Sequence, residues 1–164
     1  MCCGSMGIIY GSLYMLAQIL GGVCGSALVL ALLTREQFEF INGGVTLPSE
    51  DASIGQVLVT EFSLATVLVV TILRTAVDSK PSNLPSLAFA MIILANALAG
   101  NSISGPSVNP ARSFGPALIT GIWTHHWIYW VGPISGSLFS VLVFKLILAS
   151  ADTRWVLKRG RRAS

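Results

Sequence analysis

A short polar segment near residue 110 contains the residues best suited to binding a small molecule. Asn109 stands directly before Pro110, an order typical of a helix start, because asparagine caps free N–H groups and proline fits the first helical position. The free N–H groups at such an end carry partial positive charge and favour an oxygen atom over a cation. Arg112 follows with a fixed positive charge. The segment therefore predicts a site that orients neutral molecules and repels cations.

Covalent chemistry has little support in the sequence. Asp and Glu together number 7 and are too separated for an acid–base pair, and zinc-protease, nucleophile-elbow, P-loop and dinucleotide motifs do not occur. The three cysteines, Cys2, Cys3 and Cys24, form no C-x-x-C pair and no disulfide framework. We therefore expect no enzyme activity, no catalytic residue, no cofactor and no metal site.

The composition is that of a membrane protein. Of 164 residues, 53% are hydrophobic and 10% are charged, whereas a soluble domain carries about 25% charged residues. Five of the ten basic residues lie in the last eleven positions, directly after an apolar run. A nucleic-acid surface would spread them over a folded face. We therefore expect contact with membrane lipid, and no nucleic-acid partner.

Four apolar segments approach the length of about 20 residues that a membrane-spanning helix needs. They are residues 8–33, 53–77, 85–101 and 126–148. The sequence therefore predicts an all-α, multi-pass membrane protein with a transmembrane domain at residues 1–152 and a basic cytoplasmic tail at 153–164. The positive-inside rule places the loop at 78–84 in the cytoplasm and the loop at 35–52 outside.

Two further patterns concern the ends and the packing of these helices. Aromatic residues that prefer the headgroup region gather near the last span, at Trp123, Trp127, Tyr129 and Trp130. Glycines four residues apart, which let helix backbones approach closely, occur at positions 7 and 11, 21 and 25, and 132 and 136. We expect the aromatic cluster at the outer interface and the glycines at helix contacts.

Residues 102–124 do not fit a further spanning helix. They carry one charge, Arg112, and helix-breaking residues interrupt them at Gly105, Pro106, Pro110, Gly115 and Pro116. The helical part can run from about Pro110 to Thr120, roughly 16 Å, or half of a hydrocarbon core of about 30 Å. We predict a re-entrant segment at 102–120 that descends from outside as extended chain and returns as a half-helix. A surface turn at Asn109 and an interfacial anchor at Arg112 are the alternatives.

The segment Asn-Pro-Ala-Arg-Ser-Phe-Gly-Pro at residues 109–116 resembles the second NPA box of the aquaporin (major intrinsic protein) family. Residues 14–22, 60–62 and 126–133 resemble the family's third helix and the starts of its fourth and sixth helices. The pattern is most similar to the aquaporin-8, or aquaammoniaporin, branch. On this resemblance the chain lacks the family's first two helices and first NPA motif.

The resemblance implies roles for seven residues. Those of the NPA motif at the pore centre are Asn109, Pro110 and Ala111. Those of the selectivity filter are Arg112, Ala97 and Pro106. Glu61 matches an acidic residue that supports the re-entrant loop through backbone hydrogen bonds; a neutral glutamic acid facing a neighbouring helix is the alternative.

The resemblance also implies the function of a passive channel for water and small neutral solutes. The small Ala97 and the ring of Pro106, which has no N–H, point to a filter that admits ammonia, urea, hydrogen peroxide or glycerol. The alternative is a truncated, non-conducting isoform or a modulatory subunit. We expect a homotetramer, or a hetero-tetramer with full-length relatives, in the plasma membrane or the inner mitochondrial membrane.

Overall fold

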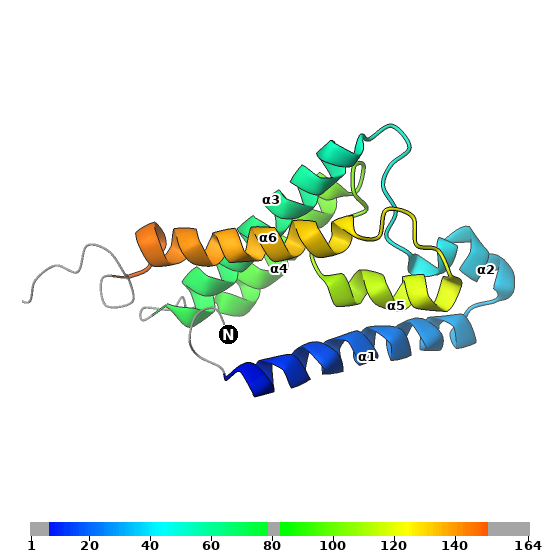
Figure 1. The fold of residues 1–164 in the computed structure, drawn as a ribbon, viewed down its shortest axis with the longest axis horizontal. Coiled ribbons are helices and arrows are strands. Elements are labelled where there is room, and N and C mark those ends of the chain that lie inside the picture. Colours follow the sequence, from blue (N-terminus) through cyan, green and yellow to red (C-terminus); the bar gives the residue numbers. More distant parts are fainter. Residues whose placement is uncertain (1–6, 79–82, 151–164) are drawn as a thin grey trace, which may run out of the picture.

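The computed structural model describes residues 7–78 and 83–150, and its regular structure there is entirely helical (Figure 1). The main helices are α1 (Ile8–Leu32), α3 (Ile54–Ile72), α4 (Pro85–Gly100), α5 (Pro110–Thr120) and α6 (Ile128–Val143). These helices confirm the predicted all-α fold. The predicted tail at 153–164 lies outside the described residues.

Three stretches of helix are long and apolar enough to cross a membrane. They are Ile8–Leu32, Ile54–Val77 and Ile128–Leu148. The second and third include terminal π-helical turns, η2 (Leu73–Val77) and η3 (Phe144–Leu148), which continue α3 and α6. The helix α4 is also apolar but has 16 residues, about 24 Å at about 1.5 Å per residue. It starts at Pro85, whose fixed φ suits the first helical position.

The segment between α1 and α3, which the sequence analysis treated as loop, contains a short helix. This helix, α2 (Arg35–Phe40), begins with a capping box in which the Thr34 and Gln37 side chains each accept the other's backbone N–H. Arg35 also donates to Glu39 one turn later, at 2.9 Å. A 3-10 turn, η1 (Asn42–Gly44), follows. A threonine three residues before a glutamine is the sequence signal for this helix start, within a segment otherwise rich in charges and turn residues.

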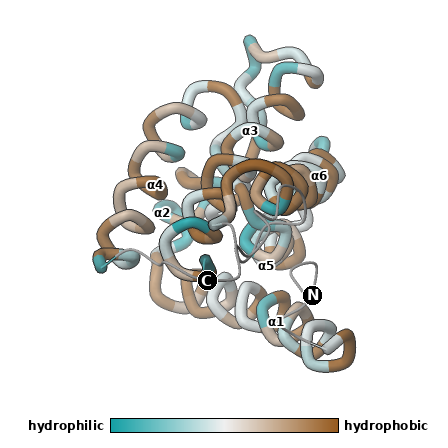
Figure 2. The backbone as a smooth tube through the Cα atoms, turned by 90° about the vertical axis from the view of Figure 1, so that its left-hand side faces the viewer, coloured by the Kyte–Doolittle hydropathy of each residue, from teal (hydrophilic) through white to brown (hydrophobic). Residues whose placement is uncertain are grey.

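The helices pack in two groups. In Figures 1 and 2, α3, α4 and α6 gather together, while α5 lies along α1. A Cβ atom built on Gly132 would come within 2.7 Å of the Glu61 side chain, and one on Gly136 would overlap the carbonyl oxygen of Phe62. These two glycines, as expected, allow α6 to approach α3 closely.

The contact between α1 and α5 depends on a different glycine from the expected one. A Cβ atom on Gly22 would lie 2.5 Å from the carbonyl oxygen of Ala111, and one on Gly115 would overlap Gly22. Cβ atoms on Gly21 and Gly25 would meet nothing within 4 Å. The expectation for positions 21 and 25 is therefore wrong, because four-residue spacing does not reveal which face of a helix is covered.

The C-terminal ends of α3 and α6 are joined through the π-helical turns that follow them. Leu73, Phe144 and Ala149 form a buried apolar cluster where the two π-helical turns meet. The buried Asp78 carboxylate accepts hydrogen bonds from the backbone N–H and the hydroxyl of Ser150 and from Arg74. This junction fixes the two longest helices of the α3–α4–α6 group at one end.

Gly22 and Gly21 offer a matched test of the α1–α5 contact. We expect Gly22→Ala to lower the free energy of unfolding by roughly 1–3 kcal/mol, because the methyl group would force the two helices apart. Gly21→Ala should leave it unchanged or raise it by about 0.5–1 kcal/mol, since alanine is the better helix former. Thermal unfolding in detergent, followed by circular dichroism, measures both. Equal shifts would contradict the packing described above.

Candidate functional site

The half-helix α5 begins in the way that its sequence predicts. Asn109 has an extended backbone, and its side-chain oxygen accepts the N–H of Ala111 at 3.0 Å. Pro110 occupies the first helical turn, and Gly121, with φ 77°, ends the helix in the left-handed conformation. The observed bounds, Pro110–Thr120, are those expected from the sequence. With 11 residues, the helix is too short to cross a bilayer.

A cavity of about 740 Å³ lies at the N-terminal end of this half-helix. The predicted site residues that line it are Ala97, Pro106, Asn109, Pro110 and Arg112. Residues far apart in sequence thus meet here, since Gln18 of α1 lines the same cavity. Two predicted residues lie elsewhere: Ala111 is buried against Gly22 of α1, and Glu61 is buried behind the descending chain.

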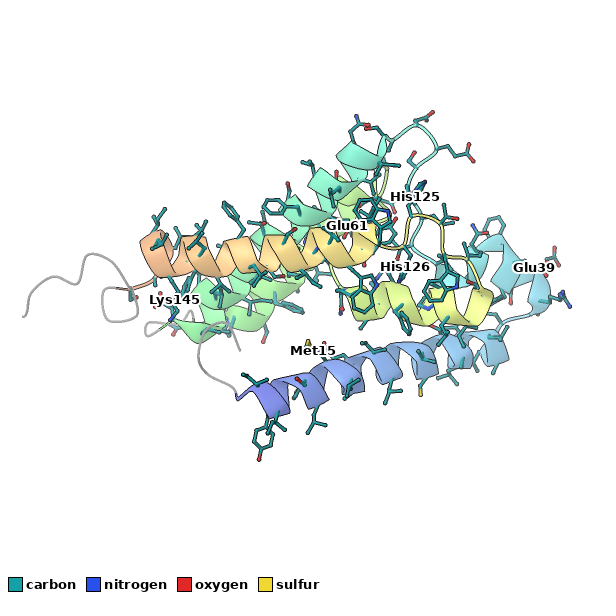
Figure 3. All side chains as sticks on the ribbon, in the orientation of Figure 1. Met15, Glu39, Glu61, His125, His126 and Lys145 are labelled. Atoms are coloured by element: carbon teal, nitrogen blue, oxygen red, sulfur yellow. The ribbon has the colours of Figure 1, made fainter. Side chains whose placement is uncertain are left out.

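The Glu61 carboxylate supports the chain that descends to Asn109. The side chain is fully buried in α3, and its two oxygens accept the backbone N–H groups of Ser107 and Val108, each at 2.8 Å. Figure 3 shows Glu61 inside the bundle, behind α6. Val108 has φ 49°, a strained value for a β-branched residue. The two hydrogen bonds to the carboxylate, directly before this strained bond, stabilise the non-helical backbone.

Tyr129 provides a second support for the descending chain. Its hydroxyl donates to the carbonyl oxygen of Ser104 at 2.9 Å, and the side chain is fully buried. The sequence analysis placed Tyr129 with the interfacial aromatic residues. That expectation is wrong for Tyr129, whereas Trp123 and Trp127 are exposed. Tyr129 can be buried because its hydroxyl finds an acceptor in the carbonyl of Ser104, which follows the end of α4.

Arg112 extends into the cavity and is held by a residue that the sequence analysis did not consider. Its Nη1 donates to the hydroxyl oxygen of Thr46 at 2.9 Å. Thr46 lies in the segment between η1 and α3 and is buried. Gln18, Asn96 and Ser137 are further polar cavity residues that were missed. A single amide within an otherwise apolar span, as at Gln18 and Asn96, is the sequence feature that indicates such a residue.

Aromatic rings from α5 and from the start of α6 surround a histidine, His126. The ring of Phe114 contacts Trp123, His126 and Trp130, with centroids 5.7, 6.3 and 6.1 Å away. The indole N–H of Trp130 donates to Nε2 of His126 at 3.0 Å, which requires an unprotonated Nε2. Partial burial lowers the pKa of His126 below its ordinary value of 6.5. The cluster links the half-helix to the start of α6.

Among the described residues, no group of three His, Cys, Asp or Glu side chains is placed to hold a metal ion. The polar groups that face the cavity are amides, hydroxyls and one guanidinium. Such groups orient and exclude molecules by hydrogen bonding and charge.

Removing the carboxylate of Glu61 tests its supporting role. We expect Glu61→Gln to speed amide hydrogen exchange at Ser107 and Val108 and to lower the free energy of unfolding by roughly 1.5–3 kcal/mol, because one N–H group loses a charged acceptor. The exposed Glu50 provides the control, since Glu50→Gln should change neither quantity. Unchanged exchange at both amides in Glu61→Gln would contradict the role.

The histidine cluster predicts a dependence of stability on pH. The pKa of His126 is lower in the fold than in the unfolded chain, so the unfolded chain binds a proton first as the pH falls. Stability should therefore be complete above about pH 6.5 and decrease below it. Melting temperatures measured from about pH 7.5 to about pH 5 should show this loss in the unchanged chain and in His125→Gln, but less of it in His126→Gln. A loss of equal size in all three would contradict the assignment.

Comparison with known proteins places this geometry in a family. Residues 1–144 match the family described as Major intrinsic protein. Aquaporin-8 of Mus musculus is 35% identical over 147 residues, covering 88% of this chain and 56% of the relative. Aquaporin TIP1-2 of Zea mays is 38% identical over 151 residues, with the same coverage of 88% and 56%. The chain thus spans about half the length of these curated relatives.

A solved structure has the same fold. The aquaglyceroporin from Plasmodium falciparum superposes with a TM-score of 0.76 at 19% sequence identity, covering 90% of this chain and 68% of that one. The sequence matches and this likeness agree with the arrangement of apolar helices around one half-helix. The chain is therefore an integral membrane protein that belongs to the major intrinsic protein family.

Proposed function

We propose that the chain forms the pore-lining part of a passive transmembrane channel for water and small neutral solutes. The observation that carries this proposal is the cavity at the start of α5, which Asn109 and Arg112 line together. A half-helix whose N-terminus opens into a cavity offers a positive potential at membrane depth. The membership of the family supports the same function.

The groups in the cavity explain how a neutral molecule would pass while cations are repelled. Asn109 uses its side-chain oxygen to cap α5, which leaves its Nδ2 group to donate to the oxygen of a passing molecule. Arg112 adds a second donor with a fixed positive charge. A cation or a proton meets both the guanidinium and the positive end of the half-helix. No covalent bond forms or breaks in this process.

Two further residues that line the cavity bear on the choice of solute. Ala97 contributes a methyl group and Pro106 a ring without an N–H donor, and both line the cavity. Small apolar walls leave space beside the guanidinium and give few competing hydrogen bonds. We propose on this basis that ammonia, urea, hydrogen peroxide and glycerol pass in addition to water.

The surroundings of the cavity bear on assembly. Among the residues of α1, only Gly11 and Ser26 are buried, and large apolar side chains of α1 and α4 remain exposed. We propose that further helices of a longer chain, or neighbouring subunits in a homotetramer or hetero-tetramer, cover these surfaces. The same exposure favours the second candidate function, a subunit that modulates full-length relatives without conducting by itself. For location we propose the plasma membrane, with the inner mitochondrial membrane as the alternative that imaging of a tagged chain would distinguish.

Stopped-flow light scattering with vesicles tests the channel proposal. Vesicles containing the chain should shrink faster than empty ones under an osmotic gradient, and Arg112→Trp should abolish the difference by filling the cavity. Arg35→Trp is the matched control, because Arg35 is exposed on α2 and its variant should conduct normally.

The same assay separates the two candidate functions. If the chain adds flux by itself, the channel proposal holds. If it adds none, but changes the flux of a co-reconstituted full-length relative in a way that Arg112→Trp removes, it is a modulatory subunit. Vesicles that remain unchanged in both arrangements would overturn both functions.

A further inference from the structure

Thr46 lies where the segment between η1 and α3 meets the half-helix α5. It is 4% exposed, and its hydroxyl oxygen is 2.9 Å from Nη1 of Arg112 and 2.9 Å from Oγ of Ser113. Arg112 is 66 positions away in sequence. Thr46 is thus a residue outside α5 that accepts a hydrogen bond from the guanidinium.

The contact continues through two further hydroxyl groups. Oγ of Ser113 is 2.6 Å from Oγ of Ser107, and Ser107 donates to the carbonyl oxygen of Asn109 at 2.9 Å. Thr46, Ser107 and Ser113 are all buried, the two serines almost completely. A series of hydrogen bonds therefore connects Arg112, through these hydroxyls, to the backbone at the start of the half-helix.

Thr46 accepts two hydrogen bonds at this point. Nη1 of Arg112 and Oγ of Ser113 each donate to its hydroxyl oxygen at 2.9 Å. A hydroxyl oxygen has two lone pairs, so this one side chain can accept from both donors. The guanidinium of Arg112 has donors and no acceptor, so Thr46 holds it through this hydroxyl oxygen.

We propose that Thr46 is a positioning residue that determines solute specificity by holding the guanidinium of Arg112 at the cavity wall. Its hydroxyl oxygen accepts from both Arg112 and Ser113, which a methyl group cannot do. Without the hydroxyl, the guanidinium loses its protein acceptor and turns to water in the cavity. The effect on specificity rests on the proposed channel function, whereas the positioning of Arg112 does not.

The position of Arg112 can be tested without any flux. Phenylglyoxal modifies accessible arginines, and mass spectrometry of the labelled full-length chain in lipid nanodiscs reports each site, with the exposed Arg35 as internal reference. Thr46→Val should raise the labelling rate of Arg112 about tenfold, the order expected when a hydrogen bond to a charged group is lost. Thr46→Ser, which keeps the hydroxyl, should label like the unchanged chain.

A matched control removes a hydroxyl elsewhere. Thr71 donates to the carbonyl oxygen of Val67 within α3 and does not line the cavity. Thr71→Val should leave the labelling of Arg112 unchanged. If Thr46→Val does not fold, as judged by circular dichroism, Thr46→Ala replaces it in every comparison. Equal labelling of Arg112 in the unchanged chain and the variant without the hydroxyl would overturn the proposal.

A second readout concerns specificity. In vesicles, Thr46→Val should raise the ratio of glycerol to water permeability about threefold or more relative to Thr46→Ser, because a mobile guanidinium leaves the passage wider. An unchanged ratio in a conducting chain would refute the role in specificity. If the unchanged chain does not conduct alone, the ratio is measured with the co-reconstituted relative. Absence of flux in both arrangements would count against the channel function, and the labelling result would still decide whether Thr46 positions Arg112.

Discussion

The two hydrogen bonds from the backbone to the buried carboxylate of Glu61 are the interaction on which the site depends. Non-helical backbone at membrane depth is tolerated only where its polar groups find partners in protein or water. Ser107 and Val108 find theirs in Glu61, and the carbonyl of Ser104 finds its partner in Tyr129. Because Glu61 lies on α3 and Tyr129 on α6, this pair of helices fixes where the chain turns into α5.

Close packing then fixes the half-helix from the other side. The α1–α5 contact at Gly22 and Gly115 leaves no room for a Cβ atom on either glycine, so the two helices have one way to fit together. The half-helix is thus held between α1 and the α3–α4–α6 group, with its N-terminal end open to the cavity. The direction of the α5 dipole and the place of Arg112 both follow from this arrangement.

Much of this arrangement could be predicted because it is encoded locally. The bounds of α5 follow from Asn109, Pro110 and the glycine at its end, and the spanning helices follow from the absence of charge. The contacts made across the fold could not be predicted in this way. Nothing near Thr46 in sequence indicates that Arg112 will reach it, and Gly22 and Gly21 are indistinguishable until the partner helix is in place. Tyr129 shows the same limit, since an aromatic residue next to two tryptophans is buried rather than interfacial.

The proposed channel requires the N-terminal end of α5 to lie at the middle of the membrane and its other end at the outer surface. Depth measurement by electron paramagnetic resonance tests it directly. One spin label is attached at Asn109→Cys and another at Gly121→Cys, in full-length chains whose native cysteines are replaced by serine. We predict that the label at 109 lies near the midplane and the label at 121 roughly 16 Å nearer the outer surface. Two labels at the same depth, or a label at 109 among the headgroups, would contradict the account.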